Sequence, residues 1–155
     1  MNVLSLFDGM SCGKLALDRA GVKYDTYLAS EIDQYALKIS QKNNPDIIQI
    51  GDVLNIQTEY LPKIDLIIGG SPCQGFSNAG KGLAFDDPRS KLFFEFVKLI
   101  DELKPKFFLL ENVRMKKAQR NNIPIISSHL SLIILLRALS ITVNYKSNKW
   151  INILY

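Results

Sequence analysis

Short apolar runs alternate with longer stretches of helical spacing along most of the chain. Each run is three to five residues long, as in a buried strand, and stops at glycine, proline, an acidic residue or a turn. The predicted strands cover residues 3–7, 27–30, 47–50, 66–68 and 107–110. This alternation of strand and helix predicts an α/β fold with a doubly wound parallel sheet in the order 3-2-1-4-5.

The stretches between the strands carry apolar residues at the spacing of one helix face. They predict helices over residues 14–20, 34–42 and 91–103, with Asp33 as the N-cap of the second. The third has apolar residues at 92, 93, 96, 97, 99, 100 and 103, which indicates a wide buried face. Residues 78–90 hold three Gly or Pro and are predicted to form a loop.

The amino-acid composition changes after about Lys117. Residues 118–155 contain four Lys or Arg and no acidic residue, so the net charge of +4 belongs to this tail and residues 1–117 are neutral overall. A basic surface over the whole domain is therefore not indicated. The tail predicts one helix, 131–139, and two strands, 141–145 and 150–154.

Composition sets the broad class of protein. A chain of 155 residues, 47% hydrophobic and 22% charged, is long enough for one globular domain with a core. Two cysteines make no disulfide framework. The longest apolar run, 132–136, is too short to span a membrane, and no signal peptide is recognised at Met1. We expect a cytoplasmic protein with no membrane association.

Cys73 follows the turn that ends the fourth predicted strand, in the stretch D-L-I-I-G-G-S-P-C-Q-G-F-S over residues 65–77. In open α/β sheets the ligand crevice lies beyond the carboxyl ends of the strands. A thiol in this place is a candidate nucleophile, and the alternative is a small, half-buried residue without a chemical role. Glu111 closes the neighbouring fifth strand, where its carboxyl could lie near the thiol or could cap the next segment.

Three acidic residues, Asp8, Glu31 and Asp52, follow three successive predicted strands. Glu31 lies 18 residues after Gly13, close to the usual distance between a glycine turn and the acid that binds ribose hydroxyls. Asp52 could bind the adenine amino group. The turn lacks the G-x-G-x-x-G pattern, so a nucleoside without phosphates fits better. The alternative is that these acids only cap helices and form turns.

Five sequence blocks, in this order, resemble the motifs of DNA (cytosine-5) methyltransferases. They are F-D-G-M-S-C-G (7–13), G-D-V (51–53), G-G-S-P-C-Q-G-F-S (69–77), R-S-K-L-F-F-E (89–95) and E-N-V (111–113). The resemblance covers about residues 1–117. It implies a Rossmann-like methyltransferase fold that is incomplete on its C-terminal side, with a catalytic region over 1–117 and a tail of unassigned fold over 118–155.

The resemblance also implies the chemistry and the residues that perform it. Cys73 would attack carbon 6 of a flipped cytosine in DNA, and Glu111 would interact with ring nitrogen 3, so that carbon 5 can accept a methyl group from S-adenosylmethionine. The implied cofactor residues are Phe7, Asp8, Gly9, Met10, Ser11, Cys12, Gly13, Glu31, Ile32, Asp52, Val53, Pro72 and Leu92. The implied DNA contacts are Gln74, Ser77, Lys81 and Arg89. No metal is expected, since the single histidine, His129, has no partner ligand at a suitable spacing.

The sequence departs from the family after residue 113. It has no Gln-x-Arg-x-Arg block, and about 40 residues are too few for a target-recognition domain, since domains usually need about 50. We therefore expect a fragment that arose by a reading-frame change or truncation, or one subunit of a split enzyme whose partner supplies DNA recognition. An inactive remnant that binds S-adenosylmethionine is the alternative. An open edge on the fifth strand would also favour self-association.

Overall fold

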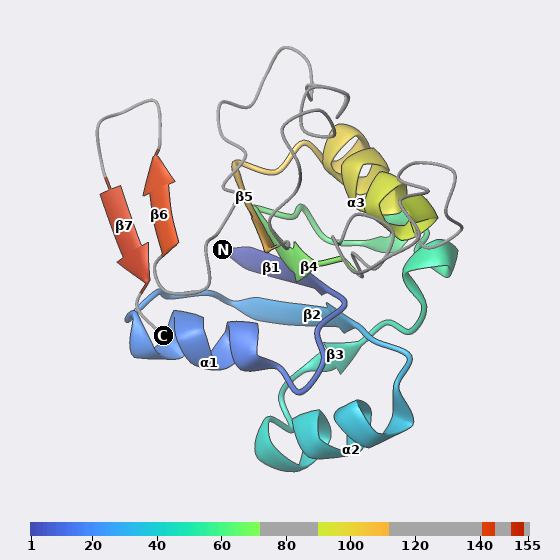
Figure 1. Cartoon of the computed structure of the whole chain (residues 1–155), viewed down its shortest axis with the longest axis horizontal. Helices are drawn as coiled ribbons and strands as arrows, with labels where there is room; N and C mark the ends of the chain where they lie inside the picture. The colour runs from blue at the N-terminus through green and yellow to red at the C-terminus, as the bar shows by residue number, and fades with distance from the viewer. Residues whose placement is uncertain (72–89, 112–140, 145–149, 154–155) are drawn as a thin grey trace, which may run out of the picture.

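Five parallel strands form the central sheet of the protein (Figure 1). The computed structural model describes residues 1–71, 90–111, 141–144 and 150–153. The strand order is β3-β2-β1-β4-β5, and every neighbouring pair is parallel, so the predicted fold class and order are confirmed. The strands are β1 (Asn2–Leu6), β2 (Thr26–Ser30), β3 (Ile48–Gln49), β4 (Leu66–Gly70) and β5 (Phe107–Glu111).

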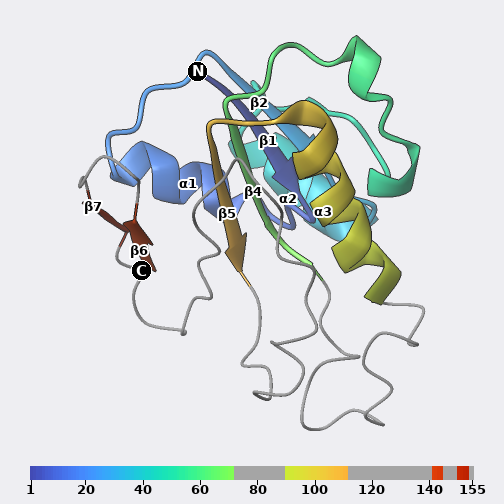
Figure 2. The same ribbon diagram turned by 90° about the horizontal axis from the view of Figure 1, so that it is seen from above.

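Helices cover both faces of this sheet. They are α1 (Cys12–Arg19), α2 (Gln34–Asn43) and α3 (Ser90–Leu103), and Figure 2 shows α1 and α3 on opposite sides of the strands. Successive residues of a strand point to opposite faces, so β1 contributes to two separate apolar clusters. Leu4 and Leu6 pack with Phe96 and Ile100 of α3, whereas Val3 packs in the cluster that contains Leu17 of α1. The result is a three-layer α/β domain.

The predicted element boundaries are close to the observed ones. Helix α1 begins at Cys12, two residues before the prediction, and Ser90 is the first residue of α3 rather than the last of a loop. Asp33 caps α2 as predicted, because its carboxylate accepts the N–H groups of Tyr35 (2.7 Å) and Ala36 (3.2 Å). Two short 3₁₀ helices, η1 (Val53–Asn55) and η2 (Thr58–Tyr60), were not predicted.

The tail contributes β6 (Ile141–Asn144) and β7 (Trp150–Ile153), which pair antiparallel in a second, two-stranded sheet. They match the two predicted tail strands apart from one residue at each carboxyl end. The predicted helix over 131–139 and the loop residues 78–89 lie outside the described residues. The domain boundary at about residue 117 stays a prediction. No helix among the described parts of the chain is long and apolar enough to cross a bilayer.

The sheet order fixes where a ligand can bind. Strand β1 is flanked by β2 on one side and by β4 on the other, with Leu6 opposite both Ser30 and Gly69. The chain runs from β1 to β2 on one side and from β4 to β5 on the other, so the connections that follow these two neighbouring strands lead in opposite directions. Open α/β sheets bind ligands in the crevice so formed. The turn after β1 and the carboxyl ends of β4 and β5 lie at this edge.

Candidate active site

The turn after β1 has an unusual backbone. Phe7, Gly9 and Ser11 have φ angles of 56°, 57° and 67°, all in the left-handed region. Glycine adopts this region readily, but for a bulky residue such as Phe7 it is an outlier. Strained backbone of this kind persists only where surrounding contacts hold it, and it concentrates at functional sites. Here the Asp8 N–H donates to the Ser30 carbonyl (3.1 Å) and the Ser11 N–H to the Asp8 carbonyl (3.0 Å).

The Asp8 carboxylate lies inside this turn and is buried. Its Oδ1 accepts hydrogen bonds from the hydroxyls of Ser5 (2.6 Å) and Tyr27 (2.8 Å), and its Oδ2 accepts one from the Ser11 hydroxyl. Three of about four acceptor positions of a carboxylate are thereby filled from within the protein. Asp8 thus builds the turn.

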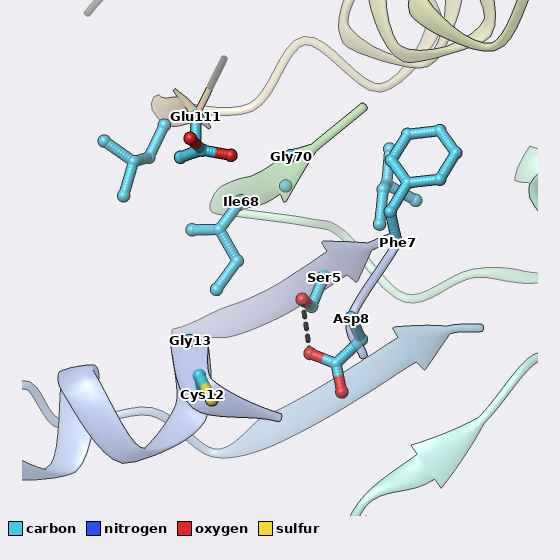
Figure 3. A pocket seen from close by; sticks show the side chains of 11 residues that line it. Ser5, Phe7, Asp8, Cys12, Gly13, Ile68, Gly70 and Glu111 are labelled. Carbon is cyan, nitrogen blue, oxygen red and sulfur yellow. Dashed lines mark hydrogen bonds between the residues drawn. The ribbon is translucent and has the colours of Figure 1, made fainter. Parts of the chain in front are cut away.

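A pocket of about 250 Å³ opens beside the turn (Figure 3). Residues from the turn and from the carboxyl ends of β1, β4 and β5 line it together: Ser5, Leu6, Phe7, Asp8, Cys12, Gly13, Ile68, Gly69, Gly70, Leu109 and Glu111. Residues more than 100 positions apart in the sequence therefore meet here. The pocket lies at the crevice that the strand order predicts for a ligand.

Glu111 reaches this pocket because Gly70 has no side chain. The two residues are partners in the β4–β5 register, and a Cβ on Gly70 would lie 2.7 Å from Glu111 Oε2. Figure 3 shows the Glu111 carboxylate beside Gly70, at the end of β5. Among the described residues it has no hydrogen bond or ion-pair partner. An exposed carboxylate that no described residue engages is a candidate for ligand binding.

Glu31 connects the end of β2 to the turn after β1. Its Oε2 accepts the N–H of Gly9 (2.7 Å), and its Oε1 accepts the N–H groups of Ile32 (2.7 Å) and Asp33 (2.8 Å). Glu31 therefore does form a turn, which was the alternative to ligand binding considered from the sequence. Oε2 makes one bond and keeps acceptor capacity for a ligand hydroxyl. Ile32, the next residue, leaves 66% of its surface exposed beside this carboxylate.

The other predicted cofactor residues that the structure describes do not line the pocket. Asp52 caps η1 by accepting the Leu54 N–H (3.0 Å). Val53 belongs to the core, and Leu92 packs against it. Met10 is exposed on the turn. Their cofactor roles stay predictions.

The predicted nucleophile, one predicted cofactor residue (Pro72) and the predicted DNA contacts lie outside the described residues. These are Pro72, Cys73, Gln74, Ser77, Lys81 and Arg89. The chain resumes its described course at Ser90, and the strand that leads to Cys73 ends at Gly70. The closeness of Cys73 to Glu111 therefore stays a prediction. Within the described residues no group of three or more His, Cys, Asp or Glu could hold a metal ion.

Sequence reasoning missed the polar residues beneath the turn. Ser5, Tyr27 and Ser40 are buried and form hydrogen bonds there. A signal existed for Ser5 and Tyr27, because each is a polar side chain within an apolar strand, and buried polar groups need partners. Nothing in the sequence named Asp8 as the partner.

The comparisons with known proteins agree with one another on a single family. The family model described as C-5 cytosine-specific DNA methylase matches residues 1–135. The orphan methyltransferase M.SPRI of Bacillus phage SPR is 44% identical over 116 residues, which is 74% of this chain and 26% of that protein. Type II methyltransferase M.Eco47II of Escherichia coli is 45% identical over 115 residues, 72% of this chain and 27% of that protein.

A third relative, type II methyltransferase M.FnuDI of Fusobacterium nucleatum, is 40% identical over 78% of this chain and 35% of that protein. The chain thus spans between 26% and 35% of the length of these three relatives. Among solved structures, a mutant of Spodoptera frugiperda DNMT2 matches with a TM-score of 0.53 at 25% identity over 78% of this chain and 37% of that one. The S. pombe Dnmt2 methyltransferase matches with a TM-score of 0.57 at 22% identity, over 77% and 37%.

Proposed function

Because the chain belongs to the C-5 cytosine-specific DNA methylase family, we propose that it is the cofactor-binding and catalytic part of a DNA cytosine-5 methyltransferase. Such an enzyme transfers a methyl group from S-adenosylmethionine to carbon 5 of cytosine in DNA. One observation supports this proposal most: a single pocket is lined by the turn after β1 and by Glu111 of β5. Cofactor and substrate chemistry need to meet in one such place.

The residues around the turn suit a nucleoside cofactor without phosphates. Glu31 offers a carboxylate oxygen for ribose hydroxyls, and exposed Ile32 offers an apolar surface on which adenine can lie. The pocket beside the turn, lined by Cys12 and Gly13, suits the amino-acid part of the cofactor. When bound there, S-adenosylmethionine supplies an electrophilic methyl group. Asp52 and Val53 would bind the adenine side, and Pro72 and Leu92 would complete the lining.

The protein's own residues would activate the cytosine. Carbon 5 of cytosine is a poor nucleophile, and attack of the Cys73 thiolate on carbon 6 breaks the ring conjugation and makes carbon 5 enamine-like. Glu111 would hydrogen-bond or protonate nitrogen 3 and take up the charge that develops. After methylation, carbon 5 loses its proton and the Cys73 thiolate is eliminated, which restores the ring. The base must first leave the duplex, at a cost of about a few kcal/mol.

The length of the relatives favours a second possibility. The chain spans only 26% to 35% of three of them, so DNA recognition by this chain alone is not supported. The chain would act with a second chain that supplies the target-recognition domain. Otherwise it is an inactive remnant that binds S-adenosylmethionine. Gln74, Ser77, Lys81 and Arg89 would contact DNA in the first case only.

Covalent trapping on DNA tests the catalytic proposal. In DNA that contains 5-fluorocytosine, fluorine cannot leave carbon 5 as a proton does, so the reaction would stop as a protein–DNA adduct on Cys73. We expect no adduct from the chain alone. An adduct should form when the chain is mixed with the C-terminal remainder of a relative such as M.SPRI, and Cys73→Ser should abolish it. An adduct that survives Cys73→Ser would contradict the assignment of the nucleophile, and failure with every partner tried would favour the remnant.

A further inference from the structure

A row of hydrogen bonds runs beneath the turn after β1, from the edge strand β3 to Asp8, and the bonds made by its two serines with Asp8 and with each other are buried. The Gln49 amide of β3 donates from Nε2 to Ser40 Oγ (3.2 Å), and Ser40 Oγ lies 2.6 Å from Ser11 Oγ. Ser11 in turn donates to Asp8 Oδ2. Ser40 and Ser11 are 0% and 1% exposed, so water does not compete for these bonds. The row therefore joins β3, α2 and the N-cap of α1 to the turn under the candidate site.

The bonds of this row all point the same way. A serine hydroxyl has one hydrogen, and Ser11 gives its hydrogen to the Asp8 carboxylate. Ser40 must consequently donate to Ser11, and it receives its own hydrogen bond from Gln49. Each hydroxyl thus accepts one bond and donates the next, and the row ends on an ionised group. Such aligned rows are cooperative, and bonds to charged acceptors are the strong ones.

Tyr27 holds the carboxylate from the other side. Its hydroxyl donates to Asp8 Oδ1 at 2.8 Å, and the residue is 2% exposed. Burial, together with the negative charge of Asp8, raises the pKa of the Tyr27 phenol, so the group remains a donor at neutral pH. Asp8 is thereby fixed between β2 and the serine row.

The row also determines how α1 begins. A serine at an N-cap usually has an extended backbone, and its oxygen accepts an N–H of the first turn. Ser11 occupies the N-cap of α1 with φ 67°, and its side chain makes no cap hydrogen bond. Its hydroxyl is instead engaged with Asp8 and Ser40. The first turn of α1 is therefore left without a side-chain cap where Cys12 and Gly13 line the pocket.

We propose that Tyr27 and Ser40 are positioning residues that set the affinity for the cofactor without touching it. Acting through Asp8 and Ser11, they hold the turn in its left-handed form before a ligand binds. They also withhold the Ser11 hydroxyl from α1, which leaves the N–H groups of its first turn to the carboxylate of the cofactor's amino-acid part. This inference rests on the proposed function, and it adds residues that lie outside the pocket lining.

Ligand titrations with two related compounds test the inference. S-adenosylhomocysteine carries the amino-acid part, whereas methylthioadenosine lacks it and keeps the nucleoside. Tyr27→Phe and Ser40→Ala should each weaken binding of S-adenosylhomocysteine about three- to tenfold, the factor that corresponds to one hydrogen bond. Binding of methylthioadenosine should be unchanged. A variant that was merely less stable would not separate the two compounds in this way.

Tyr24→Phe is the matched control. The Tyr24 hydroxyl donates to Asp18 Oδ1 at 2.5 Å on the outer side of α1, so this variant also loses one tyrosine–aspartate bond. It should bind both compounds as the wild type does. Equal loss of both compounds in Tyr27→Phe and Ser40→Ala, or no loss of either, would overturn the inference alone. Failure of the wild-type chain to bind S-adenosylhomocysteine would instead overturn the proposed cofactor site.

Amide hydrogen exchange gives a second readout that needs no ligand. The Ser11 N–H, which donates to the Asp8 carbonyl, should exchange faster in Tyr27→Phe and Ser40→Ala, while the N–H groups of central strand residues such as Leu4 and Ile67 keep their wild-type rates. Faster exchange of the turn and the strands together would show a general loss of stability and would overturn a positioning role.

Discussion

The acids at the two halves of the sheet edge that holds the pocket have different surroundings. On the β1–β2–β3 half, Asp8, Glu31 and Asp52 all accept hydrogen bonds from backbone or hydroxyl groups of the protein. On the β4–β5 half, Glu111 has no such partner among the described residues. An acid after a strand thus accepts hydrogen bonds from the protein in one half and has no partner among the described residues in the other. Under the proposed function, the first half would shape the cofactor site and the second would offer Glu111 for the chemistry.

The largest expected effect comes from removing the Asp8 carboxylate, which holds the turn on the β1–β2–β3 half together. Asp8→Ala leaves the buried hydroxyls of Ser5, Ser11 and Tyr27 without their acceptor, and each costs about 1–3 kcal/mol. The free energy of unfolding should fall by about 3 kcal/mol or more by the same estimate. Glu111→Ala, the matched change in the other half, should alter it by less than about 0.5 kcal/mol. Urea denaturation measures both, and similar losses in the two variants would remove the distinction.

Glu31 combines two roles, since it holds the turn and is expected to bind ribose. Glu31→Ala should weaken binding of S-adenosylhomocysteine by about 1.5–3 kcal/mol, the usual cost of losing a hydrogen bond to a charged group. Glu59→Ala, which removes an exposed carboxylate from η2, is the control. Calorimetric titration compares them. An unchanged dissociation constant in Glu31→Ala would leave Glu31 as a turn former only.

Alanine substitutions at two neighbouring glycines of β4 test how the β4–β5 half makes room for the Glu111 side chain. A Cβ on Gly69 would lie 2.6 Å from the Leu6 carbonyl oxygen, which is backbone and cannot move aside. Gly69→Ala should therefore destabilise the protein by about 1–3 kcal/mol, as overpacking usually does. Gly70→Ala meets only the end of the Glu111 side chain and should cost less, while displacing that carboxylate. Thermal or urea unfolding would contradict this if Gly70→Ala were the more damaging change.

The smallest expected effect concerns Asp65, which directly precedes β4 at the end of the sheet opposite the pocket. Asp65 accepts the Asn2 N–H (3.0 Å) and pairs with Lys106 (3.0 Å), and the backbone bond, followed by the Lys106 bond, lowers the pKa of its carboxyl below 3.8. A lowered pKa in the folded state adds stability above the unfolded value, and this stability is lost as the pH falls through the folded pKa. Asp65→Asn should flatten the loss of unfolding free energy below about pH 4. If the unfolding free energy of Asp65→Asn fell at low pH as it does in the wild type, the lowered pKa of Asp65 would be contradicted.

The sequence predicted the fold well because the relevant forces are local or periodic. The apolar runs and helix faces gave all five parallel strands and three helices, and Asp33 could be identified as a cap from its place before α2. The strand β3 was overestimated, since only Ile48 and Gln49 belong to it, in register with Leu28 and Ala29 of β2. The 3₁₀ helices η1 and η2 are three residues long and carry no periodic signal.

The candidate site was predicted by motif more than by physics. Periodicity placed Asp8, Glu31 and Glu111 after strands, but it did not reveal which acids the protein itself would engage. That depends on contacts such as Tyr27 to Asp8, which join residues 19 positions apart. The clearance above Gly70 depends likewise on the register between β4 and β5, which only the folded sheet defines.

Calorimetric titration of the intact chain with S-adenosylhomocysteine tests the central claim most directly. The claim is that the turn after β1, Glu31 and the adjoining pocket form a cofactor site in the chain as it stands. The account predicts saturable binding to one site per chain. A chain that is folded by circular dichroism and shows no binding of S-adenosylhomocysteine would contradict it.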